Sequence, residues 1–361
     1  MANDINALKT EEAKSTWPFK RIVVDVDEEG KSYVVTQEIS SVIMRPGFFH
    51  RADLWCTKET PVDNSIPGDR ALDLVTRDPF AGGVNCRELV MFSEVGADNE
   101  ARIAQNRDLH ERVQQKHMPS AEDYKRHPSM HRTDSVDLIS VATGEIYIMT
   151  DEDEVLMKPG DSVVIRGVNH AWSNRGTEPC ALIGGMVSAS EYELYSMEPI
   201  EVDVENASDE VKNWPFKRVV LGCNDKGKSY TMTTQVSRVF KQDSGCTVAD
   251  LWSLKEVPGN NTIEGDRALD LETLEPFPGG VVFRTVVVEP ESTGCQPEMI
   301  QMDTLDFAFV AKGEIYLVTD TEEILMKPGD GAIIKGARHT WRNRSEEPCV
   351  LNGYLTDALP R

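Results

Sequence analysis

Short runs in which apolar and polar residues alternate recur along nearly the whole chain. They include RIVVDV at 21–26, SYVVTQEI at 32–39, VDLISVA at 136–142, EIYIMT at 145–150 and SVVIRG at 162–167. Turn signals separate the runs, among them EEGK at 28–31, ATGE at 142–145 and KPGD at 158–161. A period of two places the apolar side chains on one face of a strand. Many short strands at close spacing predict an all-β sandwich or small barrel.

One segment, at about 97–126, departs from this β pattern. It reads ADNEARIAQNRDLHERVQQKHM at its start, with dense charge and few helix breakers. We therefore expect a short helical insertion there. Its role stays open between a lid, a dimer contact and a solvated excursion.

The β pattern occurs twice. WPFKR stands at Trp17 and again at Trp214, an offset of about 197 residues, whereas GEIYI at Gly144 and GEIYL at Gly313 are about 169 apart. The roughly 28-residue difference places one insertion in the first copy. All six tryptophans form matched pairs: Trp17 with Trp214, Trp55 with Trp252, and Trp172 with Trp341. The repeat predicts a first domain over 1–196, an acidic linker over 197–213 and a second domain over 214–361.

Composition narrows the classes of partner. The net charge is −23, which argues against nucleic acid and anionic membrane surfaces as partners. No apolar run reaches the roughly 18 residues of a membrane span, and the first residues lack the apolar stretch of a signal peptide. The seven cysteines include no CxxC pair, so neither a disulfide framework nor a zinc knuckle is expected. We expect a cytoplasmic protein with reduced thiols.

Two segments of the first copy, MHRTDSVDLISVATGE and LMKPGDSVVIRGVNHAWSN, resemble the two sequence motifs of the cupin superfamily. His131 takes the first histidine position, Thr133 the second and Asp137 the acidic position. In the later motif, His170 and Asn174 match. The resemblance covers both copies. It implies two tandem cupin (jelly-roll-like) β-barrels, a bicupin of a subgroup found among uncharacterised microbial and fungal proteins, some from secondary-metabolite clusters.

The resemblance places the chemistry of the first copy inside its barrel. A period of two puts His131, Thr133 and Asp137 on one face of a strand, and His170 enters from a later strand. Cupins commonly bind a divalent metal, and two imidazoles with one carboxylate are a donor set for iron, manganese, zinc or nickel. Without metal, a carboxylate beside an imidazole gives a general base, and Thr133 positions the substrate. Both interpretations, one metal ion or none, remain open.

The second copy lacks the first histidine of this set. Its equivalent positions are Ile300, Met302 and Asp306, with His339 from the later strand. We therefore predict that the second barrel is non-catalytic. An Asp–His pair kept in both copies is interpreted as a structural hydrogen bond, which leaves His131 as the distinguishing residue.

Other candidates receive structural roles. His127 is predicted at the surface, and His110 and His117 are predicted to be solvated on the inserted helix. Three pairs at matched positions are expected to be scaffold: Arg70 with Arg267, Arg87 with Arg284, and the core thiols Cys180 and Cys349.

The predicted function is that of an enzyme that modifies a small molecule inside the first barrel. We expect acid/base chemistry of the isomerase, dehydratase, cyclase or decarboxylase type on an organic acid, aromatic or polyketide-like substrate. One alternative is a metal-dependent dioxygenase that uses the two-His-one-Asp set. Another is a non-catalytic binding or storage protein, since a fold alone does not decide function. The expected partner is the small molecule, and a homodimer is compatible with the fold.

Overall fold

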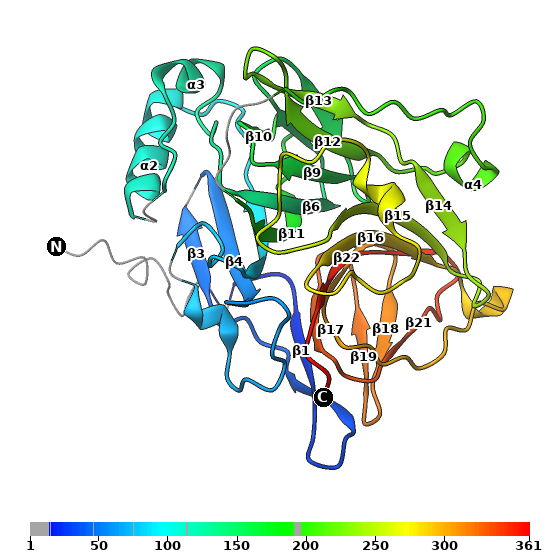
Figure 1. Ribbon diagram of the computed structural model, residues 1–361. Coiled ribbons are helices and arrows are strands. Elements are labelled where there is room, and N and C mark those ends of the chain that lie inside the picture. The colour runs from blue at the N-terminus through cyan, green and yellow to red at the C-terminus, as the bar shows by residue number, and fades with distance from the viewer. Residues whose placement is uncertain (1–13, 15, 46, 75, 113–114, 191–195) are drawn as a thin grey trace.

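The chain folds into two β-barrels, shown as a computed structural model in Figure 1. The structure describes residues 14, 16–45, 47–74, 76–112, 115–190 and 196–361. Each barrel combines one eight-stranded sheet with one three-stranded sheet. This confirms the all-β, tandem-barrel prediction, including the helical insertion in the first copy.

The first barrel carries the candidate site. Its large sheet has the order β13 (Ser229–Thr233), β12 (Arg218–Cys223), β9 (Ser162–Arg166), β6 (Ser135–Thr143), β11 (Cys180–Ser188), β5 (Val84–Met91), β4 (Phe49–Cys56) and β3 (Val42–Arg45). Its small sheet has the order β10 (Ala171–Ser173), β7 (Ile146–Met149) and β8 (Glu154–Met157).

The second barrel repeats this plan. Its large sheet has the order β14 (Arg238–Lys241), β15 (Thr247–Leu254), β16 (Val281–Val288), β22 (Cys349–Asp357), β17 (Thr304–Lys312), β20 (Gly331–Lys335), β1 (Arg21–Val26) and β2 (Ser32–Thr36). Its small sheet has the order β19 (Glu323–Met326), β18 (Ile315–Val318) and β21 (Thr340–Arg342).

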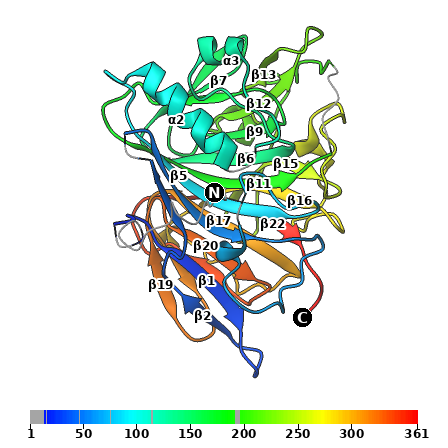
Figure 2. The ribbon, with the colours of Figure 1, turned by 90° about the vertical axis from the view of Figure 1, so that its left-hand side faces the viewer.

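The two copies exchange their first hairpins. Strand β1 pairs in parallel with β20, and β12 pairs in parallel with β9, so each barrel is completed by strands from the other copy. The turned view shows β1 and β2 lying with β19 and β20 of the second barrel (Figure 2). Sequence copy and sheet membership therefore do not coincide, although the repeat is real.

This exchange explains why the WPFKR and KPGD motifs recur. The backbone N–H of Lys217 donates to Asp161 Oδ1 at 2.7 Å, and that of Lys20 donates to Asp330 Oδ1 at 2.8 Å. Gly160, at φ +95°, lies against the ring of Phe216, where a side chain would clash. The repeated motifs thus hold one copy against the other.

Helices are few. The insertion forms α2 (Asn99–Arg112) and α3 (Ala121–Arg126), which lie together beside β3 and β4 (Figure 1). The other helices of the described residues are short: the α-helix α4 (Asp209–Lys212) and the 3-10 helices η2 (Arg70–Asp73), η3 (Arg267–Asp270) and η4 (Glu291–Thr293). No helix in the described ranges is both long and apolar enough to cross a membrane.

Candidate functional site

The first barrel encloses a cavity of about 90 Å³ that contains three of the four predicted residues: His131, His170 and Asp137. His131 and His170 form an isolated antiparallel bridge, in which each backbone N–H donates to the other's carbonyl at 2.9 Å. This bridge holds the two rings 4.2 Å apart, centroid to centroid. Asp137 reaches the same space from β6.

Backbone contacts fix the form of both imidazoles. Nδ1 of His131 lies 2.7 Å from the carbonyl oxygen of Ser129, and Nδ1 of His170 lies 2.9 Å from that of Val168. A carbonyl only accepts, so each Nδ1 carries the proton and each Nε2 is left as an acceptor. Burial, with the charge of Arg77 adding to it, lowers the pKa of His170 to about 4 and that of His131 well below its usual value. Both rings are therefore neutral at pH 7.

The pKa of Asp137 shifts in the opposite direction. It is 4% exposed, and burial raises its pKa from 3.8 to about 7, although a hydrogen bond from the Ser135 hydroxyl favours the carboxylate. Thr133 bonds Ser135 through their hydroxyls at 2.7 Å. Thr133 is thus buried and linked to Asp137 only through the Ser135 hydroxyl. It is not among the residues that line the cavity.

The interpretation of Asp137 and His170 as a hydrogen-bonded structural pair is wrong. The Asp137 carboxylate accepts from Ser135, and His170 donates to Val168. Asp137 lies 33 positions before His170 in the sequence. The two residues are related only because both line the same cavity.

Sequence reasoning missed two residues of this site, Arg77 and His110. Helix α2 covers the cavity with Asn106, Leu109 and His110, and His110 is only 2% exposed, so its predicted solvation is wrong. Nη1 of Arg77 lies 3.0 Å from His110 Nε2 and 2.9 Å from Gln115 Oε1. The buried positions of α2 are Arg102, Asn106, Leu109 and His110, and because three of them are polar, no apolar periodicity marks the buried face in the sequence.

The inserted segment is anchored by two further histidines. His127 is buried, contrary to the predicted surface position, and its Nε2 lies 3.1 Å from Glu94, which also pairs with Arg102 of α2. His117 is partly buried and lies 2.7 Å from Asp134. The insertion is therefore a packed cover of the first barrel, not a solvated excursion.

The matched arginines and cysteines serve as scaffold, as predicted. Arg87 Nε donates to Asp53 at 2.9 Å, and Arg284 Nε donates to Asp250 at 2.6 Å. Arg70 pairs with Asp73 one turn away in η2. Cys180 and Cys349 are fully buried, and burial raises the pKa of each to about 12, so neither is a nucleophile.

The cavity does not present the full ligand set that is typical of a cupin metal site. Across the described part of the chain, no three His, Cys, Asp or Glu side chains are grouped where they could hold one metal ion. The Arg77 guanidinium lies close enough to lower the pKa of both cavity histidines, and such a charge also opposes a second cation. Two of the four ligand positions typical of cupins are Thr133 and Asp137 in this chain.

A known domain family matches both halves of the chain. The cupin domain profile matches residues 117–185 and again residues 284–355. Two solved structures align over most of the chain at 9% identity. AerE from Microcystis aeruginosa gives a TM-score of 0.43 over 88% of this chain and 97% of that one. Oxalate decarboxylase from Lactobacillus farciminis, as its formate complex, gives 0.40 over 88% and 83%.

Curated relatives are fungal. Oryzines biosynthesis cluster protein J from Aspergillus oryzae is 44% identical over 89 residues, which is 24% of this chain and 48% of that protein. Phomopsin biosynthesis cluster protein D from Diaporthe leptostromiformis is 44% identical over 70 residues, 19% and 35% of the two chains. The cupin-domain-containing oxidoreductase srdB from Neurospora crassa is 34% identical over 109 residues, 28% and 54%. The chain thus spans about half, or less, of these relatives. The cupin domain is found twice in this chain, so the chain carries two cupin domains in tandem.

Proposed function

We propose that this protein is a small-molecule enzyme whose first barrel performs acid/base chemistry on a compact organic acid. The observation that carries the proposal is Asp137, a buried carboxyl group whose pKa of about 7 lets it both accept and donate a proton near neutral pH. His131 and His170 are neutral neighbours whose Nε2 atoms can accept hydrogen bonds from the substrate. The reaction type is isomerase, dehydratase, cyclase or decarboxylase.

The charges around the cavity favour an anionic substrate. Arg77 is a cation beside two neutral imidazoles, so it can hold a carboxylate or stabilise an enolate as it forms. In the proposed step, the Asp137 carboxylate takes a proton from the carbon next to the carboxylate or carbonyl group. The protonated Asp137 then returns it to another atom, or to a departing hydroxyl group. This sequence consumes no oxidant and no reductant.

The size of the cavity limits the substrate. About 90 Å³ corresponds to about three waters at their share of liquid volume, about 30 Å³ each, so the reacting part of the substrate is small. Relatives encoded in the oryzine and phomopsin biosynthesis clusters support a role in secondary metabolism for this chain as well.

Exchange of substrate C–H protons with solvent deuterium tests the proposal without knowledge of the product. Small carboxylic acids are incubated with the protein in D₂O and followed by proton NMR. Asp137→Asn should slow the exchange by about 10²–10⁴-fold, because a general base is lost while shape is kept. Asp306→Asn, the matched change in the second barrel, should leave the rate unchanged. The proposal is overturned if Asp137→Asn exchanges protons at the rate of the unaltered protein, or if both variants lose the same share of that rate.

A metal-dependent dioxygenase is the second candidate. It is favoured by the imidazole orientation, because Nδ1 bonded to a backbone carbonyl with Nε2 free is the arrangement of metal-ligating histidines. Elemental analysis of the purified protein tests it. Stoichiometric iron, manganese, zinc or nickel that is lost in His131→Ala supports this candidate, and metal content independent of His131 rejects it.

The non-catalytic alternative, a binding or storage protein, is tested by the same incubations. Such a protein would retain its ligand unchanged, with no deuterium incorporated.

A further inference from the structure

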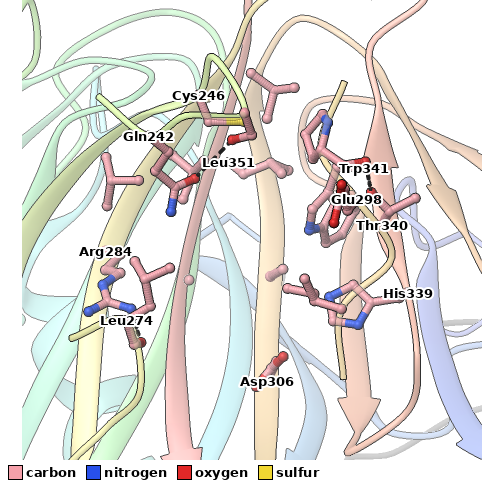
Figure 3. Close-up of a pocket in the computed structure, with 18 of the residues that line it drawn as sticks. Gln242, Cys246, Leu274, Arg284, Glu298, Asp306, His339, Thr340, Trp341 and Leu351 are labelled. Carbon is pink, nitrogen blue, oxygen red and sulfur yellow. Dashed lines mark hydrogen bonds between the residues drawn. The ribbon is translucent and has the colours of Figure 1, made fainter. Parts of the chain in front are cut away.

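The second barrel contains a far larger cavity than the first, about 660 Å³ against about 90 Å³ (Figure 3). Its exposed wall is mostly apolar, with Trp341 on one side and His339 and Asp306 together at one end. A chamber of this size, apolar with a few polar groups, is the usual form of a site for a small organic ligand. The role proposed for the first barrel does not use it.

Substitutions between the copies create this space. At four matched positions, a bulky side chain in the first cavity is replaced by a smaller one in the second. The pairs are Phe48 and Gly245, Phe49 and Cys246, Met91 and Val288, and Ile139 and Ala308. The second copy also lacks an insertion equivalent to α2, and in the described part of the chain it has no helix of comparable length.

The same comparison shows that cationic and imidazole groups are lost. Three polar residues of the first cavity become aliphatic in the second: Arg51 becomes Val248, Arg77 becomes Leu274, and His131 becomes Ile300. These replacements leave Arg284 as the cation of the second chamber, and its charge is already engaged.

Arg284 binds Asp250 through Nε and the carbonyl oxygens of Leu274 and Thr273 through its terminal nitrogens. Two exposed acidic residues, Asp243 and Glu298, also line the chamber. An anionic ligand therefore finds no free cation among the residues that line this chamber, and it meets two negatively charged side chains.

Two of the hydrogen-bond acceptors that line the chamber, on Asp306 and His339, lie at the same end of it. Asp306 is 7% exposed, and its Oδ1 meets no hydrogen-bond partner among the described residues. Nδ1 of His339 lies 2.9 Å from the carbonyl oxygen of Ala337, so Nδ1 carries the proton and Nε2 is left as an acceptor. Figure 3 shows both side chains at the same end of the cavity. A buried acceptor without a donor is costly, and a ligand that brings a donor removes that cost.

We propose that the second barrel binds an uncharged, largely apolar molecule that carries a hydroxyl group, of the class of phenols and hydroxylated polycycles. The hydroxyl donates to Asp306 or His339, and the hydrocarbon body fills the aliphatic chamber beside Trp341. No covalent step is involved. The second barrel is thus a binding site with its own ligand class, distinct from the compact acid proposed for the first barrel.

Four probes of matched shape test the ligand class by titration calorimetry: 2-naphthol, 2-methoxynaphthalene, 2-naphthoate and 2-naphthylmethylammonium. We expect 2-naphthol to bind with a stoichiometry of one, and at least about tenfold more tightly than 2-methoxynaphthalene and 2-naphthoate, which lack a donor, since one good hydrogen bond corresponds to about that factor. Equal binding of 2-methoxynaphthalene, tighter binding of either charged probe, or no saturable binding of any probe overturns the proposal.

Three variants locate the site. Asp306→Ala should abolish the preference of 2-naphthol over 2-methoxynaphthalene while the methoxy compound still binds, which shows that the barrel is folded. Ala308→Trp should fill the chamber and abolish binding of both. Asp137→Ala, the matched change in the first barrel, should bind 2-naphthol as the unaltered protein does. Unchanged selectivity in Asp306→Ala, or unchanged binding in Ala308→Trp, contradicts the assigned site. Because the function proposed for the first barrel depends on Asp137, the two proposals fail independently.

Discussion

The two barrels share one scaffold but differ in what their interiors contain. Both keep an aspartate on the same strand position and a histidine on the facing one, Asp137 with His170 and Asp306 with His339. In the first barrel, arginines and a second histidine surround this pair under a helical cover, and the cavity is small. In the second, aliphatic residues surround it and the cavity is large. The residues of the cavity wall, and not the shared Asp–His pair, therefore distinguish a reactive site from a binding chamber.

Changing Asp137 to Asn should reveal the largest energetic consequence of this difference. Burial raises the pKa of Asp137, so between about pH 4 and pH 7 the folded chain holds the proton that the unfolded chain releases. The free energy of unfolding therefore falls as pH rises through that window, by about 4 kcal/mol at most. Asparagine carries no charge, so Asp137→Asn should be the more stable protein at pH 8, with a gap that narrows towards pH 5. Urea unfolding at several pH values measures it.

Asp306→Asn is the matched control for that experiment. Burial also raises the pKa of Asp306, while the nearby His339 opposes the rise, so a gap of the same sign is expected. If Asp137→Asn is no more stable than the unaltered protein at pH 8, burial does not raise the pKa of Asp137, and this residue ionises like an ordinary aspartate.

The helical cover is the next feature to test, because the second barrel has no counterpart. Leu109 of α2 is 6% exposed and lines the first cavity. Leu109→Ala should lower the free energy of unfolding by about 2–3 kcal/mol through lost apolar contact and an enlarged cavity. Gln105→Ala, on the exposed side of the same helix, should change it by less than about 0.5 kcal/mol. Equal effects of the two changes would show that α2 is not a packed cover.

Arg77→Leu introduces the residue found at the matched position of the second copy, Leu274. Arg77 lowers the pKa of Asp137, so its removal should raise that pKa further, and the pH at which exchange activity is half-maximal should move upwards by about one unit. Substrate affinity should fall as well, since the proposed carboxylate loses its cation. A pH profile of deuterium exchange, recorded at saturating substrate, separates the two effects. An unshifted profile would show that Arg77 does not influence the pKa of Asp137.

Much of the fold could be predicted from the sequence because it is encoded locally. Alternation predicted strands such as 21–26 and 162–167, and repeated motifs predicted two barrels. The exchange of hairpins could not be predicted in this way, because the pairing of β1 with β20 joins residues about 310 positions apart. Nothing in the local pattern of Arg21–Val26 specifies which of two similar sheets it joins.

The site was predictable only in part, for a related physical reason. His131, Asp137 and His170 lie in motifs whose spacing is typical of the family, and the structure places them in one cavity. Arg77 lies in a loop and His110 on the insertion, and only tertiary packing brings them to 3.0 Å. Their positions in the sequence carry no such information.

If the first barrel holds a carboxyl group that transfers protons, the ionisation of Asp137 itself should show it. The protein is labelled with ¹³C at the aspartate Cγ, and its carboxyl resonances are followed by NMR from pH 5 to pH 9, with Asp137→Asn used to assign the signal. We expect a resonance that titrates with a pKa of about 7 and is absent from the variant. A signal for Asp137 that shows no titration above pH 5, the behaviour of an ordinary aspartate, would contradict it.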